Sequence, residues 1–126
     1  MAKKITIKPY ADEPGRYCSK RTADGWFVMI DHALRLVRAT RPDDPSAPQP
    51  VREWVKWGAG PRAGQALLLG AKAAALLDGR SVPEPADVDR VALPVLRHRL
   101  LLNFQAEADG LDADHVVGRI LDAVRG

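Results

Sequence analysis

The chain has 126 residues, 46% of them hydrophobic, which is the size of one domain with enough apolar side chains for a core. The net charge of +3 permits contact with phosphates or acidic protein surfaces, but no basic run is long or interleaved with aromatic residues, which argues against nucleic-acid binding. A single cysteine, Cys18, excludes an internal disulfide, and no apolar run is long enough for a secretion signal or a membrane span. We therefore expect a soluble, cytoplasmic protein without membrane contact.

The first thirty residues differ in pattern from the rest of the chain. Residues 4–8 alternate polar and apolar side chains as a half-buried strand does, and residues 26–30 form a second short apolar run. This pattern predicts either a short β-hairpin or an irregular arm over residues 1–30, without a special function. Residues 31–126 are expected to form a separate all-α domain, a small bundle of four to five helices.

The first two predicted helices are separated by a proline-rich linker. One helix is expected from about residue 27 or 30 to Thr40, where Pro42 stops it, and the next over residues 51–57, where Gly58 ends it. The intervening residues 41–50 contain four prolines and are expected to be a stiff connection. The residues expected to pack in the core are Ile30, Ala33, Leu34 and Val37 of the first helix, and Trp54, Val55 and Trp57 of the second.

The third helix is predicted over residues 61–78. Pro61 suits a first helical turn, and Gly79 suits a C-terminal cap. The apolar stripe is mostly alanine and glycine, so another helix or a backbone segment is expected to pack closely against it. Arg62 lies at the helix start, where unsatisfied N–H groups favour an anion, so a cation there makes sense beside a phosphate or a carboxylate. On spacing alone, a solvated surface arginine is the favoured alternative.

Two further helices complete the predicted bundle. A fourth helix is expected over residues 86–92 with Pro85 at its entrance, and Pro94 should break it and begin another turn through Leu100. Residues 100–102 with Phe104 are expected to form a short buried segment. Asp112 should cap the last helix, whose apolar stripe consists of Val116, Val117, Ile120, Leu121 and Val124.

Several separate blocks of this sequence resemble the C-terminal lid of MoxR-type AAA+ ATPases. The blocks are Trp57-Gly58-Ala59-Gly60-Pro61-Arg62-Ala63, Leu69-Gly70-Ala71-Lys72-Ala73, Asp78-Gly79-Arg80 and Val95-Leu96-Arg97-His98-Arg99-Leu100, and the resemblance covers about residues 31–124. It implies a lid-like domain without its motor domain. It also implies that Arg62 is the sensor-2 residue, which reaches the phosphates of bound ATP from the lid.

The resemblance makes other residues candidates for contact with a nucleotide or a neighbouring subunit. These candidates are Gly60, Pro61, Arg97, His98 and Arg99. For the last three, salt bridges with Glu107, Asp109 or Asp112 are an equally good interpretation. The partners that the resemblance implies are an AAA+ motor domain or other ATPase subunits, and the associated function is chaperone-like.

Catalytic and metal-binding motifs are absent from the sequence. No Gly-x-x-x-x-Gly-Lys-Ser/Thr loop is present, and no apolar strand ends in Asp-Glu to hold magnesium. His32, His98 and His115 are far apart, and with one cysteine they show no metal-ligand spacing. The chain alone is therefore expected to bind no cofactor and to hydrolyse no ATP; ATP and Mg²⁺ enter only with a motor domain.

A second hypothesis assigns the chain no nucleotide role. The helical bundle and the arm would then form a stand-alone protein-interaction or homo-oligomerisation module, with a strand around Ile5 and Ile7 pairing with its copy. Nucleic-acid binding through the arginines is a third and weaker alternative, which predicts a steep loss of affinity with salt.

Overall fold

The computed structural model describes residues 20–126, with side chains from residue 25 onward, as a mostly helical protein. Within this range it has six helices and a two-stranded antiparallel sheet, so the expected all-α fold is confirmed with more helices than the four to five predicted. The elements are α2 (Lys20–Ala39), α3 (Gln49–Trp54), β1 (Val55–Trp57), α4 (Pro61–Leu77), α5 (Pro85–Leu96), β2 (Leu101–Leu102), α6 (Phe104–Ala108) and α7 (Ala113–Arg125). No helix in this described range is both long and apolar enough to cross a bilayer.

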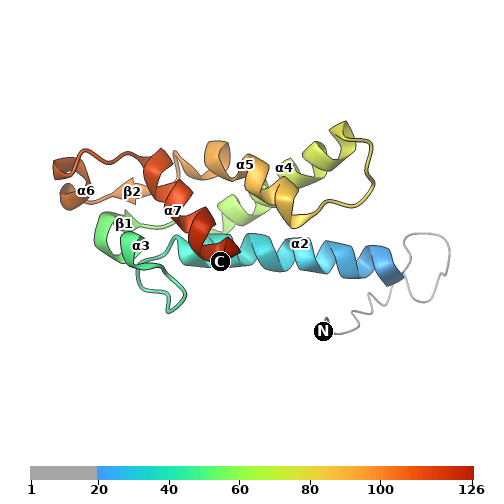
Figure 1. The fold of residues 1–126 in the computed structure, drawn as a ribbon, viewed down its shortest axis with the longest axis horizontal. Coiled ribbons are helices and arrows are strands. Elements are labelled where there is room, and N and C mark those ends of the chain that lie inside the picture. Colours follow the sequence, from blue (N-terminus) through green and yellow to red (C-terminus); the bar gives the residue numbers. More distant parts are fainter. Residues whose placement is uncertain (1–19) are drawn as a thin grey trace.

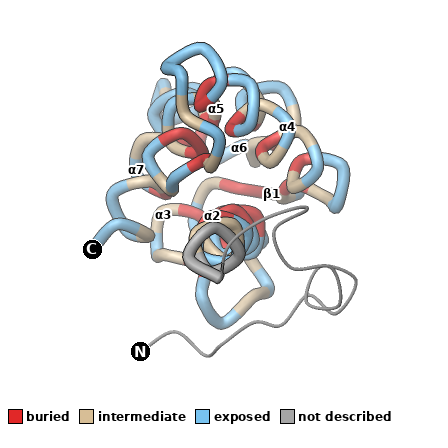
Figure 2. The backbone as a smooth tube through the Cα atoms, turned by 90° about the vertical axis from the view of Figure 1, so that its right-hand side faces the viewer, coloured by how far each residue is buried: buried red, intermediate tan, exposed pale blue. Residues whose placement is uncertain are grey.

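The helices enclose one core between α2 and the α4–α5 pair. Helix α2 runs along one side, α4 and α5 lie on the other, and α7 crosses against both (Figure 1). The short elements α3, β1, β2 and α6 gather at one end. The buried segments of the helices face the core between them (Figure 2). The largest fully buried apolar side chains come from different elements and include Met29, Leu36, Val51, Leu67, Leu96 and Ile120.

Helix α2 begins earlier than predicted and turns a different face inward. Residues 26–30, expected as the second hairpin strand, are helical, and the strand expected at residues 4–8 lies outside the described residues. Ala33 and Val37 are buried as predicted, but Ile30 and Leu34 are exposed and Met29 and Leu36 take their place. The apolar side of this helix is wider than the strip that α4, α5 and α7 cover, so the sequence pattern did not show which of its apolar residues would be buried.

The segment after α3 forms a strand instead of continuing the helix. Val55 pairs with Leu102, and Trp57 pairs with Leu101. The β-branched Val55 and the aromatic Trp57 are residue types that suit a strand. Val55 is buried and Trp54 is half-buried, as expected of packing residues, whereas Trp57 is 65% exposed. The prediction of a helix over residues 51–57 was therefore right only up to Trp54.

Helices α4 and α5 pack very closely, as the small residues of α4 predict. A Cβ atom added to Gly70 would lie 3.0 Å from Cγ2 of Val91 on α5. The chain leaves α4 through Gly79, whose φ of 76° is the left-handed conformation expected at a helix C-terminus. Pro94 does not break α5, which continues to Leu96 with a buried face of Val88, Ala92 and Leu96.

A buried carboxylate joins the end of α4 to the start of α5. Asp87 is 1% exposed and accepts hydrogen bonds from both terminal nitrogens of Arg80, at 2.6 and 2.8 Å, and from the Glu84 backbone N–H at 2.8 Å. The Arg80 hydrogen bonds outweigh the cost of burial and hold the pKa of Asp87 below its ordinary value. Asp87 therefore stays charged and orders the connection between the two helices.

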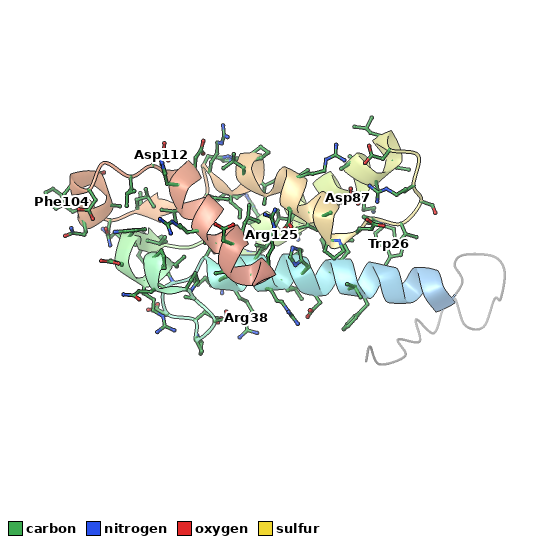
Figure 3. All side chains as sticks on the ribbon, in the orientation of Figure 1. Trp26, Arg38, Asp87, Phe104, Asp112 and Arg125 are labelled. Atoms are coloured by element: carbon green, nitrogen blue, oxygen red, sulfur yellow. The ribbon has the colours of Figure 1, made fainter. Side chains whose placement is uncertain are left out.

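The C-terminal part of the domain agrees with the sequence in its last helix and, in part, in the segment expected to be buried before it. The Asp112 carboxylate accepts the His115 backbone N–H at 2.9 Å, and Val116, Val117 and Ile120 are buried, as predicted. The expected buried segment is wrong in part. Leu100 is buried, but Leu101 and Phe104 are exposed, and Phe104 lies at the opposite end of the molecule from Trp26 (Figure 3).

Candidate functional site

The candidate site is the short loop between β1 and α4. Gly60 is the N-cap of α4, Pro61 is its first residue, and the Ala63 backbone N–H donates to the Gly60 carbonyl at 3.0 Å. Arg62 follows Pro61, so its side chain leaves the first turn of a 17-residue helix. The sequence thus placed Gly60, Pro61 and Arg62 correctly at a loop-to-helix junction.

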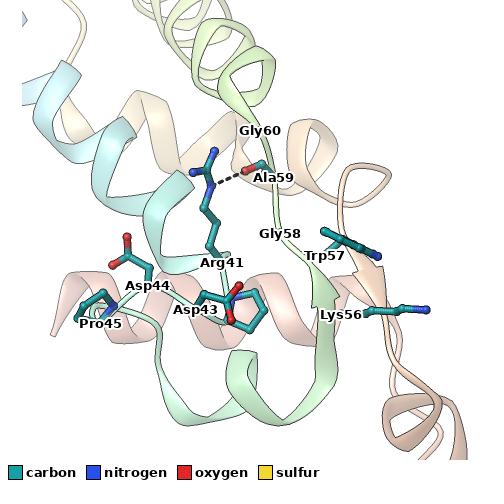
Figure 4. Close-up of a pocket in the computed structure, with 10 residues that line it drawn as sticks. Arg41, Asp43, Asp44, Pro45, Lys56, Trp57, Gly58, Ala59 and Gly60 are labelled. Atoms are coloured by element: carbon teal, nitrogen blue, oxygen red, sulfur yellow. Dashed lines mark hydrogen bonds between the residues drawn. The ribbon is translucent and has the colours of Figure 1, made fainter.

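The end of α2 holds this loop in place. Thr40 is fully buried; its hydroxyl donates to the Val37 carbonyl at 2.6 Å and accepts the Ala59 backbone N–H at 2.9 Å. The Nε of Arg41 donates to the Ala59 carbonyl at 3.2 Å (Figure 4). Both backbone groups of Ala59 are therefore bonded to Thr40 and Arg41, the two residues that follow α2. Sequence reasoning missed Thr40, because nothing in the local pattern signals a partner 19 residues away.

Gly58 is required where the loop passes the end of α2. A Cβ atom at this position would lie 2.4 Å from the Thr40 carbonyl oxygen and 2.8 Å from Cα of Arg41, both backbone atoms that cannot move aside alone. A Cβ atom at Gly60 would meet nothing within 4 Å. The two glycines of this loop therefore serve different purposes, and only Gly58 makes the close approach.

Arg62 differs from most arginines of the described part. Arg38, Arg80, Arg97 and Arg125 each contact a carboxylate, namely Asp44, Asp87, Asp114 and Asp89. Arg62 is exposed, and among the described residues its side chain has neither an ion-pair partner nor a hydrogen bond. Helix α4 carries no Asp or Glu between Pro61 and Leu77. Its first turn thus offers a cation and a positive dipole end to an anion from outside.

A hollow of about 610 Å³ lies on the α2 side of the loop, lined by residues 41–45 and 56–60. Arg41 points into it toward Ala59, whereas Lys56 and Trp57 extend away from Arg41 (Figure 4). Asp43 and Asp44 also line it. Hydrogen bonds from the Ser46 hydroxyl and backbone, and then from Arg38, lower the pKa of Asp44 to about 2, so it carries a full charge. These carboxylates make the hollow itself a poor phosphate site, and the case for anion binding rests on Arg62.

The other predicted cations lie at the same end of the α4–α5 pair. The two helices are antiparallel neighbours, so the start of α4 and the C-terminal end of α5 at Leu96 lie at the same end of the pair, and Arg97, His98 and Arg99 follow directly after Leu96. Arg97 pairs with Asp114 at 3.3 Å, which was not among the three partners expected. Arg99 donates to the Val95 carbonyl at 2.7 Å and lies 2.6 Å from Nε2 of His98. Arg97 is therefore ion-paired, but none of the three expected carboxylates is its partner.

The described residues offer no site for a metal ion, since no cluster of three or more His, Cys, Asp or Glu side chains occurs among them. His32 is engaged with Asp89 at 2.7 Å, and His115 with Asp112 at 2.7 Å. What the loop and the start of α4 can do is bind an anion electrostatically.

Comparison with known proteins places this arrangement in context. A family model described as "AAA lid domain" matches residues 47–120. The chain is 38% identical over 97 residues to "Chaperone MoxR1" of Mycobacterium tuberculosis, a match that covers 77% of this chain and 26% of that protein. It is also 37% identical over 71 residues to "Uncharacterized protein YeaC" of Bacillus subtilis, a match that covers 56% of this chain and 22% of that protein. The chain therefore spans about a quarter of the length of these relatives.

A solved structure has the same fold. It is a crystal structure of a "putative ATPase" from Cytophaga hutchinsonii, with a TM-score of 0.72 and 28% sequence identity. The likeness covers 82% of this chain and 32% of the other chain.

Proposed function

The chain belongs to the AAA lid domain family of MoxR-type AAA+ ATPases, and from this premise we propose that Arg62 is its sensor-2 residue, which contacts ATP held by a motor domain. The observation that carries the proposal is the exposed guanidinium in the first turn of α4, without a carboxylate partner in the described part of the chain. The residues that resemble the lid motif are thus the same residues that leave a cation available.

The electrostatics of this position suit a triphosphate. A guanidinium can donate two parallel hydrogen bonds to phosphate oxygens, and the N-terminal dipole of α4 adds a positive potential in the same place. Such a preorganised cation is worth most in a site from which water is excluded. Since Arg62 is exposed in the domain itself, we expect the motor domain to complete that dry site.

The lid alone is not expected to hydrolyse ATP. The 126 residues contain no phosphate-binding loop with its lysine, and no apolar strand that ends in Asp-Glu. ATP and Mg²⁺ would be held by the motor domain, and the function of Arg62 would be to stabilise charge on the phosphates during transfer. Arg99 and His98, at the same end of the α4–α5 pair, are candidates for a second contact with the nucleotide or a neighbouring subunit.

A reconstituted ATPase tests the proposal. The Mycobacterium relative without the segment that this chain matches supplies the motor, and the full 126-residue chain is added to it. We expect the wild-type chain to restore ATP hydrolysis and the Arg62→Ala variant to lower the rate by about 100-fold, the cost of removing one preorganised donor. The control is Arg119→Ala, which removes an exposed arginine from α7. The proposal is wrong if the Arg62 variant restores hydrolysis as well as the wild type does.

A further inference from the structure

Helix α2 leaves part of its apolar side uncovered. Phe27 is 42% exposed, Ile30 is 37% exposed and Leu34 is 54% exposed. The steps of three and four residues between them place all three within about 60° of arc on one side of the helix. Met29 and Leu36 are fully buried on the other side, where α2 contacts α4, α5 and α7. We call Phe27, Ile30 and Leu34 the outer stripe of α2.

The outer stripe has the form of a helix-packing surface. Within the part of the chain that the structure describes, about half of the Leu34 side chain is left in water. Three large apolar side chains in a row on one helix face are the pattern by which two helices pack, each side chain fitting between side chains of the other helix. Helix α4 lies on the opposite side of the core (Figure 1), so a contact at the stripe leaves Arg62 accessible.

The charges beside the stripe restrict what can cover it. Asp31 and Arg35 follow one edge of the stripe, and they pair with each other at 2.9 Å while 45% and 68% of their side chains stay exposed. A surface that is charged with one sign repels one of these two residues. The covering surface must therefore offer a cation to Asp31 and an anion to Arg35.

A second copy of α2 that runs antiparallel to the first meets this requirement. If a two-fold axis passes near Ala33, Asp31 of each copy lies level with Arg35 of the other copy. In a parallel pair, by contrast, Asp31 would face Asp31 and Arg35 would face Arg35, and both contacts are repulsive. The order of charges on α2 therefore selects the antiparallel arrangement.

The same axis also matches the apolar side chains. Leu34 of each copy falls between Ile30 and Leu34 of the other copy, as a knob fits its hole. At each end of the contact Phe27 lies beside Arg38 of the other copy, whose guanidinium can stack on the ring. Arg38 bonds Asp44 at 3.1 Å but stays 62% exposed, so it is accessible for this contact.

We propose that the outer stripe of α2 is a homodimer interface, in which two copies of this chain pack their α2 helices antiparallel about a two-fold axis near Ala33. The contact does not involve Arg62, so the inference is independent of the function proposed above. The dimer presents two lid domains, each with an exposed Arg62. One helix face per copy makes an interface below about 1,200 Å², so the association is weak.

Sedimentation equilibrium of the full 126-residue chain tests the proposal, under reducing conditions so that Cys18 forms no intermolecular disulfide. We expect the average mass to rise from 13.8 kDa toward twice that value over about a hundred-fold increase in concentration. Leu34→Glu places two carboxylates near the two-fold axis and should weaken dimerisation by about 100-fold or more. The control is Leu76→Glu, which replaces a leucine that is 71% exposed on α4 and should leave dimerisation unchanged.

Two charge variants test the pairing of Asp31 with Arg35 between copies. Asp31→Arg makes both positions positive and Arg35→Asp makes both negative, so each variant alone should dimerise roughly 10-fold more weakly at low ionic strength. Mixed in equal amounts, the two variants carry opposite charges and should associate as strongly as the wild type. If the pair acts only within one helix, mixing restores nothing, and the antiparallel pairing is wrong.

The inference is overturned if the wild-type chain sediments as a monomer throughout, or if Leu34→Glu associates as tightly as the wild type. A monomer whose melting temperature falls with Leu34→Glu but not with Leu76→Glu would assign the cover of the stripe to residues 1–19 of the same chain. None of these outcomes changes the function proposed for Arg62, which is tested by ATP hydrolysis.

Discussion

Replacement of Gly58 by alanine should destabilise the domain far more than the same replacement at Gly60. The added methyl group at Gly58 would lie 2.4 Å from the Thr40 carbonyl oxygen, 2.7 Å from its carbon and 2.8 Å from Cα of Arg41. These are backbone atoms at the end of α2, so the loop must move away from them. That movement separates the Ala59 N–H from the buried Thr40 hydroxyl, which it contacts at 2.9 Å.

The size of the effect follows from these two losses. Overpacking of a tight site costs about 1–3 kcal/mol, and loss of the hydrogen bond adds about 1 kcal/mol, which gives roughly 2–4 kcal/mol. At about 4 °C per kcal/mol for a domain of this size, the melting temperature should fall by roughly 8–16 °C. At Gly60 the added methyl group meets nothing and φ is −96°, so the gain of about 0.4–1 kcal/mol from a stiffer unfolded chain should roughly offset the poorer N-cap that alanine makes, and the change should be close to neutral.

Thermal and urea unfolding of the two variants, followed by circular dichroism at 222 nm, measure this difference. The Gly60→Ala variant controls for the general effect of glycine replacement on the unfolded chain. Equal melting temperatures for the two variants would refute the reasoning, because the loop would then be free to move away from α2 at no cost.

Three further predictions concern carboxylates. Asp87→Asn should lower the free energy of unfolding by roughly 2–3 kcal/mol in urea titrations. This is less than the cost of breaking a fully buried pair, because Arg80 is one-third exposed. The control, Asp122→Asn on the surface of α7, should have little effect. The pKa values of Asp87 and Asp78 are lowered mainly by Arg80, and that of Asp112 mainly by the His115 N–H. As the pH falls, the unfolded chain therefore takes up protons before the folded chain does, and stability should fall below about pH 4. Unchanged stability between pH 5 and 3 would contradict this. Asp112→Ala should cost about 1 kcal/mol through loss of the α7 cap, against no change for Asp122→Ala in the same thermal assay.

Local signals predicted the parts of the fold that local interactions determine. Helix α4 was placed to within one residue, because a proline, a glycine and a helical period coincide there. The cap of α7 at Asp112 was predicted for the same reason. The pairing of Val55 with Leu102 was missed, because it joins residues that are distant in the chain. Leu34 was placed in the core, although the packing of α2 leaves it exposed, since the apolar side of this helix is wider than the part that its neighbours cover.

The candidate site was predictable in position but not in detail. The motif placed Arg62 at the start of a helix, and the structure agrees. Whether a surface arginine is paired depends on packing between helices, as the unforeseen contact of Arg97 with Asp114 illustrates. The same holds for Thr40, whose hydroxyl contributes to the site only because the fold brings the end of α2 against Ala59.

The loop before Arg62 is attached to the end of α2, so the position of the loop depends on the direction of that helix. A helix of 20 residues is about 30 Å long, so a tilt of about 10° carries its far end through roughly 5 Å. Thr40 and Arg41 bond Ala59 to that end, and Arg62 is three residues further along the chain. A change in the direction of α2 relative to α4 would therefore have to shift the loop before Arg62 or break the hydrogen bonds of Ala59 with Thr40 and Arg41.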